Sequence, residues 1–285
     1  MFKASIYFQF MRLAAITIDV DRDVNMPLPG RREAGSAPRD GNDTPRFASS
    51  TQGLSLIVEL LNDMSIRGTF FLEADTARHI ASEVNIRNML RGHEIASHGH
   101  SHEDLTGKKT GVFIDIAEKA NIIDKASQII QELTGQFPKG FRAPYQNIDN
   151  TVLELLAERG YLYDSSITNS ITNGRINPHA LSSGLIEIPL AKGVDANGKS
   201  IHSYLWPMHE GKRQPGDYLD LLDQYDDGLL VLATHSWHIV ETFTGPLSRS
   251  LIDSNLDNVR MILDEALEKG IEFITLDKYV EKFYY

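Results

Sequence analysis

The sequence has no cysteine among its 285 residues, which excludes disulfides, thiolate-bound zinc and cysteine nucleophiles. It also lacks an apolar run long enough for a transmembrane helix. Basic residues are in the minority, with 28 Lys and Arg against 39 Asp and Glu, and the formal net charge is −11. A negative surface argues against a general binder of nucleic acids or anionic membranes. The remaining composition, 41% hydrophobic and 24% charged, is that of an ordinary globular protein.

The amino-terminal segment makes a poor signal peptide. Phe2 to Phe10 is only mildly apolar, carries a single lysine and has no A-x-A-like cleavage site. Met11 stands directly before the first strand-like run, so we interpret residues 1–10 as an extension and residues 11–285 as one domain. The absence of cysteine fits a reducing compartment, and we expect a cytoplasmic protein.

Strand-like and helix-like segments alternate along the chain. This alternation is typical of a parallel sheet, open or closed, and favours the α/β class. Short β-branched runs occur at 13–18, 68–72, 94–96, 140–142, 162–163, 185–189, 229–233 and 272–275. Helical periodicity occurs at 51–64, 74–88, 111–134, 149–159, 217–225 and 255–269.

Histidines are concentrated in one short segment, residues 92–102, which contains four of the ten in the chain. Two of them, His98 and His102, are four residues apart and follow a predicted strand, and imidazoles so spaced can reach one divalent ion. His100 would point to the opposite side and is left out of the ligand set. A metal also needs an anionic ligand, and Asp19 and Asp21 follow the first strand. Together the two motifs predict a hydrolytic metal site.

The candidate residues all come directly after predicted strands. In a parallel barrel such positions share the carboxyl-end face, where barrel active sites are built. Each also has a structural alternative. The aspartates could cap the chain after the strand, the histidines could form a turn network, and an arginine could lie on the surface. The candidates are Asp19, Asp21, His98, His102, Arg142, Asp164 and His235.

The ordered set of motifs resembles the polysaccharide deacetylase family, the chitooligosaccharide deacetylase homology domain. The resemblance extends from Leu13 to about Phe283. It depends on Thr17–Asp21, Gly68–Phe71, Gly92–Ile95 leading into His98 and His102, Phe141–Tyr145, Gly160–Tyr161 with Tyr163–Ser165, and Leu232–His235.

The resemblance implies a distorted (β/α) barrel with about seven parallel strands. It further implies that Asp21, His98 and His102 bind a divalent ion, usually zinc, with cobalt, nickel or manganese as other options. Asp19 would be the catalytic base and His235 the catalytic acid. The implied supporting residues are Arg142, which would hold the base, Tyr145, whose amide would stabilise the oxyanion, and Asp164, which would tune Arg142 or His235.

Two positions depart from the common family pattern. Val20 separates Asp19 from Asp21, whereas many members have adjacent aspartates. Ser236 follows the last motif histidine, where many members have an aspartate. The first departure leaves open which carboxylate has which role, and the second bears on substrate choice.

The expected function is metal-dependent hydrolysis of a carbon–nitrogen amide bond, as N-deacetylation or N-deformylation of an amino sugar. An allantoinase-like cyclic amide hydrolase, some of which work without metal, is the main alternative. A two-histidine, one-carboxylate iron oxygenase and a non-catalytic sugar-binding protein are further alternatives. We expect a sugar or small-molecule partner, no nucleic acid and no stable membrane insertion, and homo-oligomer formation stays open.

Two long irregular stretches, residues 25–50 and 191–216, have no role that the sequence assigns. Loops of this length are usually functional or disordered. His202, Trp206 and His209 lie on the second and could shape a pocket, although packing onto the barrel explains them equally well. Substrate identity and the physiological metal also stay open.

Overall fold

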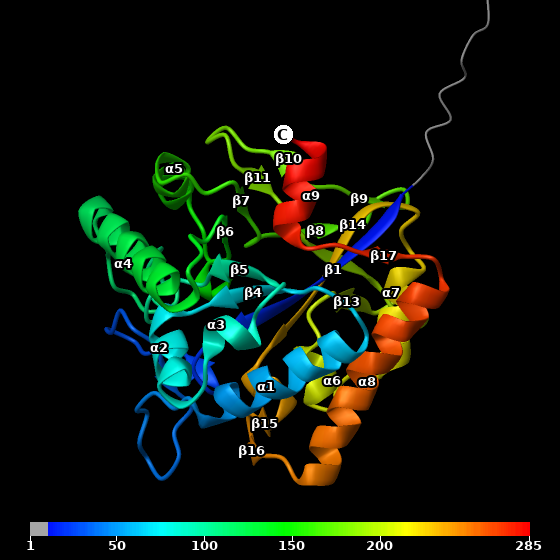
Figure 1. Cartoon of the computed structure of the whole chain (residues 1–285), viewed down its shortest axis with the longest axis horizontal. Coiled ribbons are helices and arrows are strands. Elements are labelled where there is room, and N and C mark those ends of the chain that lie inside the picture. The colour runs from blue at the N-terminus through cyan, green and yellow to red at the C-terminus, as the bar shows by residue number, and fades with distance from the viewer. Residues whose placement is uncertain (1–10) are drawn as a thin grey trace, which may run out of the picture.

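The structure, a computed structural model, describes residues 11–285 and is built around a curled, mainly parallel sheet (Figure 1). The strands run in the order β10-β11-β7-β6-β5-β4-β1-β14-β9, and β17 also pairs with β1. Every pairing in this sheet is parallel except that of β10 with β11. The strands are β1 (Arg12–Val20), β4 (Thr69–Leu72), β5 (Glu94–Ser97), β6 (Gly140–Phe141), β7 (Tyr163–Asp164), β9 (Arg175–Ile176), β10 (His179–Ala180), β11 (Ile186–Glu187), β14 (Asp227–His235) and β17 (Glu272–Phe273). The predicted α/β class and distorted barrel are confirmed.

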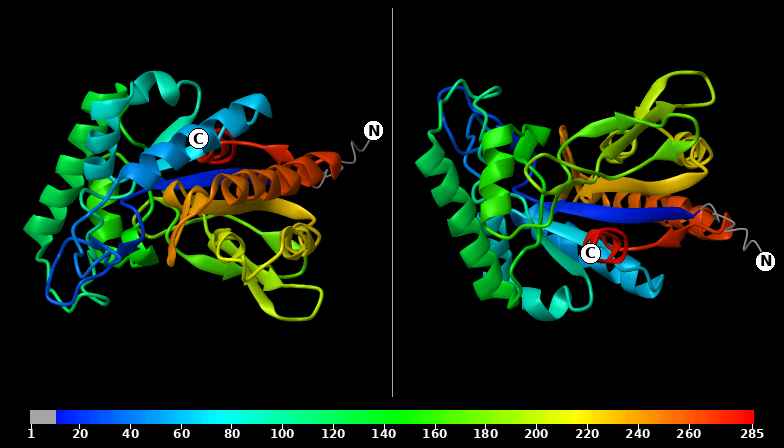
Figure 2. Two further views of the ribbon diagram at one scale, coloured as in Figure 1. Left: turned by 90° about the horizontal axis from the view of Figure 1, so that it is seen from below. Right: turned by 90° about the horizontal axis from the view of Figure 1, so that it is seen from above.

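Most of the helices lie around the outer side of this sheet (Figures 1 and 2). Helix α1 contacts α8, α8 contacts α7, and α4 contacts α2, α3 and α5. The helices are α1 (Ala48–Asp63), α2 (Ala74–Glu83), α3 (Ile86–Met89), α4 (Ile116–Thr134), α5 (Asn150–Glu158), α6 (Trp206–His209), α7 (Pro215–Leu222), α8 (Arg249–Glu268) and α9 (Leu276–Phe283), with single turns η1 (Pro144–Gln146) and η2 (Trp237–Ile239).

The alternation of side chains along β1 separates two cores. Ala14, Ile16 and Ile18 pack outward among the helices. Leu13 and Ala15 point inward and pack with Phe71, Val231 and the first turns of α9. Because successive side chains of a strand point to opposite faces, the inward set continues from Leu13 and Ala15 to Thr17, Asp19 and, beyond the strand, Asp21. The inserted Val20 therefore leaves both aspartates on the inner side.

Three small sheets lie outside the strand–helix repeat. They are β2 (Asn25–Met26) with β3 (Gly35–Ser36), β13 (Ser200–His202) with β12 (Leu190–Val194) and β8 (Thr168–Ser170), and β15 (Glu241–Thr242) with β16 (Gly245–Pro246). The β12–β13 hairpin also pairs with the barrel, since Tyr204 bridges to Ala233 of β14. This hairpin therefore fills the side between β11 and β14 and brings residues 202–206 to the site.

Several predicted boundaries were wrong. The expected helix 74–88 is interrupted at Val84, whose φ of −137° is extended rather than helical. The expected helix 111–134 begins only at Ile116, after Asp115 caps it by accepting a hydrogen bond from the Glu118 N–H. Helices α6 and α9 were not predicted. The proposed extension, residues 1–10, lies outside the described residues.

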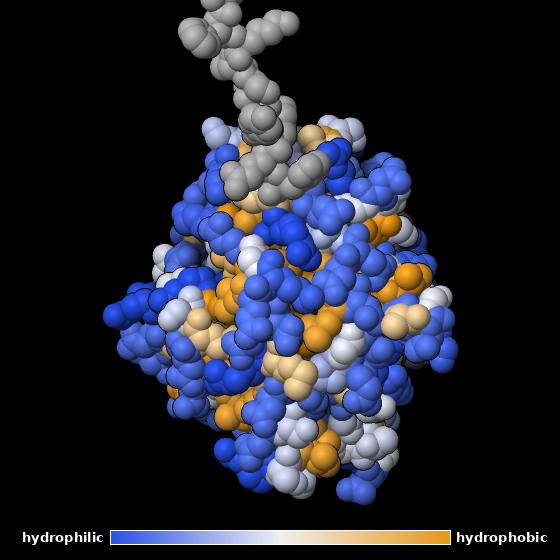
Figure 3. Space-filling view, turned by 90° about the vertical axis from the view of Figure 1, so that its right-hand side faces the viewer, coloured by the Kyte–Doolittle hydropathy of each residue, from blue (hydrophilic) through white to orange (hydrophobic). Residues whose placement is uncertain are grey.

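Within residues 11–285, no helix is both long and apolar enough to cross a bilayer. On the face shown in Figure 3, hydrophobic residues are scattered among hydrophilic ones.

Candidate active site

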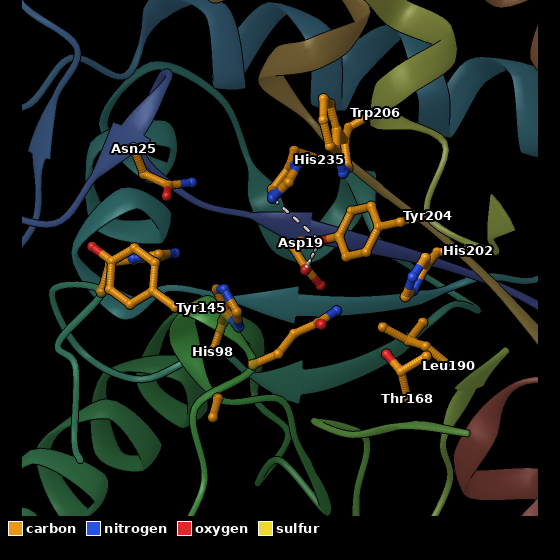
Figure 4. A pocket seen from close by; sticks show the side chains of 13 residues that line it. Asp19, Asn25, His98, Tyr145, Thr168, Leu190, His202, Tyr204, Trp206 and His235 are labelled. Carbon is orange, nitrogen blue, oxygen red and sulfur yellow. Dashed lines mark hydrogen bonds between the residues drawn. The ribbon is translucent and has the colours of Figure 1, made fainter. Parts of the chain in front are cut away.

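The carboxylate of Asp19 lies at the centre of a pocket at the carboxyl end of β1 (Figure 4). Its Oδ1 accepts a hydrogen bond of 2.8 Å from Arg142 Nη1, and its Oδ2 accepts one from the Tyr204 hydroxyl. Burial by itself would raise the pKa of this carboxyl, but the Arg142 guanidinium beside it, with smaller contributions from nearby histidines, lowers the pKa to about 2. Asp19 is therefore ionised at neutral pH.

Arg142 is fully buried beneath Asp19, where its guanidinium is held in one orientation. Nη1 also donates to Thr17 Oγ1 (2.9 Å), while Nε and Nη2 donate to the carbonyl and hydroxyl of Ser165 (both 3.0 Å). The guanidinium carbon lies 4.1 Å from the centre of the Phe71 ring. The predicted role of Arg142, to hold Asp19 in place, agrees with this geometry.

Asp21, His98 and His102 form a buried group whose ligand atoms lie within 4.8 Å of one another. His98 Nδ1 is 2.7 Å from the Arg142 carbonyl oxygen, so it carries the hydrogen and leaves Nε2 as the ligand atom. His102 Nε2 lies 3.3 Å from Asp21 Oδ2. The backbone turns at Gly99 (φ +80°) and His102 itself has a φ of +55°, which returns its ring to the pocket. His100, which was expected to point away from the ligand set, instead contacts Ser101 and Glu103.

The chemistry of these three residues fits a divalent cation. Asp21 Oδ1 is buried without a hydrogen-bond partner, and burial raises the pKa of this carboxyl to about 7. Burial lowers the pKa of His102 to about 4, so its imidazole is neutral, as a metal ligand must be. A buried carboxylate between two neutral imidazoles is a costly arrangement that a bound cation would stabilise. The prediction that the chain has a site able to hold a divalent metal is confirmed.

His235 stands directly beside Asp19, because parallel pairing of β14 with β1 places the two residues in register. Its Nε2 is 3.2 Å from the Tyr204 hydroxyl and 3.9 Å from Asp21 Oδ2. The side chain is 18% exposed, on the side that faces the pocket. Burial lowers the pKa of His235 to about 4, while the carboxylates of Asp21 and Asp19 act in the opposite direction. The protonated form of His235 is therefore stabilised by neighbouring groups that accept hydrogen bonds from its two N–H groups.

Tyr145, which lies next to the group of Asp21, His98 and His102, has a left-handed backbone conformation with φ +58° and ψ 11°. The edge of its ring meets His102, with ring centres 4.6 Å apart. This conformation is strained for a residue with a side chain, and such strain concentrates at functional sites. Among the hydrogen bonds of the described residues, none involves the Tyr145 N–H, so this amide is available as a donor in the pocket.

Asp164 makes no hydrogen bond or ion pair with Arg142 or His235 within residues 11–285, although its charge interacts with that of Arg142. Its carboxylate instead accepts from the Ser166 hydroxyl (2.7 Å) and N–H (3.0 Å), and Ser166 Oγ in turn accepts from the Ala143 N–H (2.8 Å). Asp164 points away from the pocket because it follows Tyr163, whose ring takes the inward position on β7. Its contribution is to support the turn that carries Arg142.

Sequence reasoning missed two pocket residues that hydrogen-bond to Asp19 or Asp21. Tyr204 joins Asp19 to His235 through one hydroxyl, and Asn25 Nδ2 donates to Asp21 Oδ2 over 2.5 Å. Asn25 lies in the short strand β2 and Tyr204 between β13 and α6, both outside the strand–helix repeat, where no periodicity marks them. His202 and Trp206, which the sequence left between packing and pocket, line the pocket together with Thr168 and Leu190, and its volume is about 250 Å³.

The fold and site thus define a distorted (β/α) barrel with an Asp-His-His group at the carboxyl ends of its strands. Residues 42–163 match the family model described as polysaccharide deacetylase. The resemblance to the polysaccharide deacetylase family that the motifs indicated is confirmed by this match.

Curated relatives match parts of the chain. One is a peptidoglycan deacetylase-like protein of Gibberella zeae, 42% identical over 27% of this chain and 21% of its own. Another is a peptidoglycan deacetylase of Helicobacter pylori, 25% identical over 41% of this chain and 38% of its own. A third, chitin deacetylase 1 of Bombyx mori, is 28% identical over 54% of this chain and 30% of its own. The chain therefore spans between about a fifth and two fifths of the length of these relatives.

Solved structures share the whole fold at low sequence identity. A Mycobacterium smegmatis protein assigned to the polysaccharide deacetylases superposes with a TM-score of 0.64 at 21% identity, covering 99% of this chain and 93% of its own. A pseudoenzyme of Bacillus anthracis superposes with a TM-score of 0.54 at 12% identity, covering 95% of this chain and 66% of its own. Since a pseudoenzyme has the same fold, the fold alone does not establish activity, and the argument for function depends on the site.

Proposed function

We propose that this chain is a divalent-metal-dependent hydrolase that cleaves the amide bond of an N-acylated amino sugar, releasing an amine and a short carboxylic acid such as acetate. The observation that carries the proposal is the position of Asp19 and His235. These two proton-transfer groups are paired in register on β1 and β14 and flank the Asp21, His98 and His102 group in one pocket. The names of the curated relatives support amino sugars as the substrate class.

Each residue has a role that its surroundings support. Asp21, His98 and His102 would hold the ion, which we propose to be zinc because the donor set of two imidazoles and one carboxylate suits it. When bound, such an ion supplies a Lewis acid that polarises an amide carbonyl and favours ionisation of water.

The remaining groups move protons and stabilise charge. Asp19 accepts the proton of the attacking water, because it is ionised and its oxygens keep free lone pairs beside Arg142 and Tyr204. The Tyr145 N–H donates to the oxyanion that develops on the carbonyl. His235 delivers a proton from Nε2 to the leaving nitrogen, so that a neutral amine departs.

The size of the pocket also suits a second candidate function, the hydrolysis of a cyclic amide or imide. A volume of about 250 Å³ holds one small ring, and a cyclic amide or imide contains the same type of bond. A cytoplasmic location would suit either a small metabolite or a soluble sugar precursor, and it stays a prediction.

The test is an activity panel on protein loaded with zinc, cobalt or nickel. N-acetylglucosamine, its short β-linked oligomers and an N-formyl sugar are compared with hydantoin and allantoin. Acetate or formate release that requires the metal and is abolished in Asp19→Asn supports the proposal. Ring opening of the cyclic amides alone would replace it with the second candidate, and no turnover of any substrate would refute both.

A further inference from the structure

Behind His235, away from the pocket, two more side chains form a line of hydrogen bonds. His235 Nδ1 lies 3.3 Å from Nδ1 of His238, and His238 Nε2 lies 3.0 Å from Oε1 of Glu210. His238 is fully buried, whereas His235 reaches the pocket with its other nitrogen, Nε2. The line therefore runs from Glu210 at the end of α6, through η2, to the proposed proton donor.

The chemistry of these groups fixes the direction of each hydrogen bond. An ionised carboxylate only accepts, so His238 must carry its hydrogen on Nε2. A neutral imidazole with hydrogen on Nε2 has a lone pair on Nδ1. Within residues 11–285, the structure places one donor beside His238 Nδ1, the Nδ1–H of His235, and His238 Nδ1 therefore accepts from it. The carboxylate of Glu210 thus determines the tautomer of an imidazole that it does not touch.

Packing holds the intermediate histidine in place. The His238 ring stacks on Trp237, with ring centres 3.6 Å apart, and the Phe243 ring meets it edge-on at 5.4 Å. Glu210 Oε1 also accepts a hydrogen bond of 2.9 Å from the Phe243 N–H, which anchors the carboxylate to the β15–β16 segment. A side chain packed against two aromatic rings and hydrogen-bonded at both nitrogens has one orientation, which it imposes on its neighbour.

We propose that Glu210 and His238 are positioning residues for His235. Together they keep the hydrogen of His235 on Nδ1 and direct Nε2 to the pocket, where a proton can be taken up and delivered to the leaving nitrogen. This inference depends on the proposed function of His235 as proton donor, but the arrangement of hydrogens can be measured without any turnover.

The direct test is nitrogen-15 NMR of histidine-labelled protein at a pH where both rings are neutral. In the wild type we expect hydrogen on Nε2 of His238 and on Nδ1 of His235, each confirmed by loss of its signals in a His→Phe variant. In Glu210→Ala we expect both histidines to become mixtures of the two tautomers. A wild-type His238 with hydrogen on Nδ1, or tautomers unchanged in Glu210→Ala, would overturn the inference.

Kinetics then measure the consequence for catalysis. Glu210→Ala should lower kcat roughly ten- to hundredfold, the range found when an outer partner of a metal-binding histidine is removed, while KM stays within about twofold and metal content is unchanged. Glu210→Gln keeps an acceptor oxygen and should recover part of the loss. Equal kcat values for wild type and Glu210→Ala would contradict the positioning role.

A matched control separates positioning from disturbance of the 241–245 segment. Thr242 Oγ1 bonds to Thr244 and to the Gly245 carbonyl in that segment, and among the described residues it makes no hydrogen bond to Glu210 or His238. Thr242→Val should leave kcat near the wild-type value, and an equal fall in both variants would assign the effect to the segment. If the wild type turns over no amide, the proposed function fails, and the tautomer measurement still decides the inference.

Discussion

The Asp19–Arg142 pair permits a quantitative test of how the site is stabilised. Both side chains are buried, and Arg142 donates four hydrogen bonds to Thr17, Asp19 and Ser165. Replacing Arg142 by methionine keeps most of the volume but leaves Asp19 as a buried charge without its partner. Removing one partner of a buried ion pair costs about 3–5 kcal/mol, so Arg142→Met should lower the free energy of unfolding at pH 7 by about that amount.

The pKa of Asp19 also predicts how the stability loss in Arg142→Met changes with pH. In the wild type the pKa of Asp19 is about 2, below its ordinary value of 3.8. The ionised carboxylate therefore contributes stability above its ordinary pKa, and this stability is lost as the pH falls through about 2. Without the guanidinium, burial raises the pKa of Asp19. In Arg142→Met the penalty should then be largest at neutral pH and should decrease as the pH falls through the raised pKa.

Urea denaturation with a metal chelator present, at pH 7 and pH 4.5, measures both effects. The double variant Asp19→Asn with Arg142→Met should be more stable at pH 7 than Arg142→Met alone, since no buried charge remains unpaired. The reasoning is refuted if Arg142→Met loses less than about 1 kcal/mol at pH 7, or if its loss increases as the pH falls to 4.5.

Three further predictions concern activity and metal binding. Tyr204→Phe removes a hydrogen bond to ionised Asp19 that is worth about 1.5–3 kcal/mol, so kcat should fall roughly ten- to hundredfold. An unchanged kcat in steady-state assays would contradict the role of this hydroxyl. Because burial raises the pKa of Asp21 to about 7, metal affinity should fall about tenfold per pH unit below pH 7, as measured by competitive titration. An affinity that stays constant between pH 5.5 and 7 would contradict the role of Asp21 as a ligand that must lose its proton. Trp206→Ala should raise KM for amino sugars roughly two- to tenfold, as loss of an aromatic contact does, and an unchanged KM would assign Trp206 to packing.

The sequence predicted the parts of the site that depend on strand periodicity. Asp19, Asp21 and His235 lie on or just after long β1 and β14, where the period of two determines which side chains point inward. His98 and His102 were predicted by their density and spacing, although the left-handed turn at His102 that brings its ring into the pocket has no glycine to mark it.

The residues that the sequence did not place depend on contacts between distant segments. Tyr204 reaches Asp19 only because the β12–β13 hairpin pairs with β14, and no local pattern reports that pairing. The line from Glu210 to His238 joins residues 28 positions apart, the first at the end of α6 and the second in η2. The contacts of Asp164 could not be read from its motif position either. Tyr163 takes the inward position on β7, and Asp164 supports the turn behind Arg142 through Ser166.

The most direct test of the central claim is the metal content of purified protein, by elemental analysis, for the wild type and three single histidine variants. We predict about one divalent ion per chain in the wild type and in His100→Ala, a matched control from the same turn, and almost none in His98→Ala or His102→Ala. A wild type that binds neither zinc, cobalt nor nickel, or a His98→Ala variant that keeps its full metal content, would contradict the account.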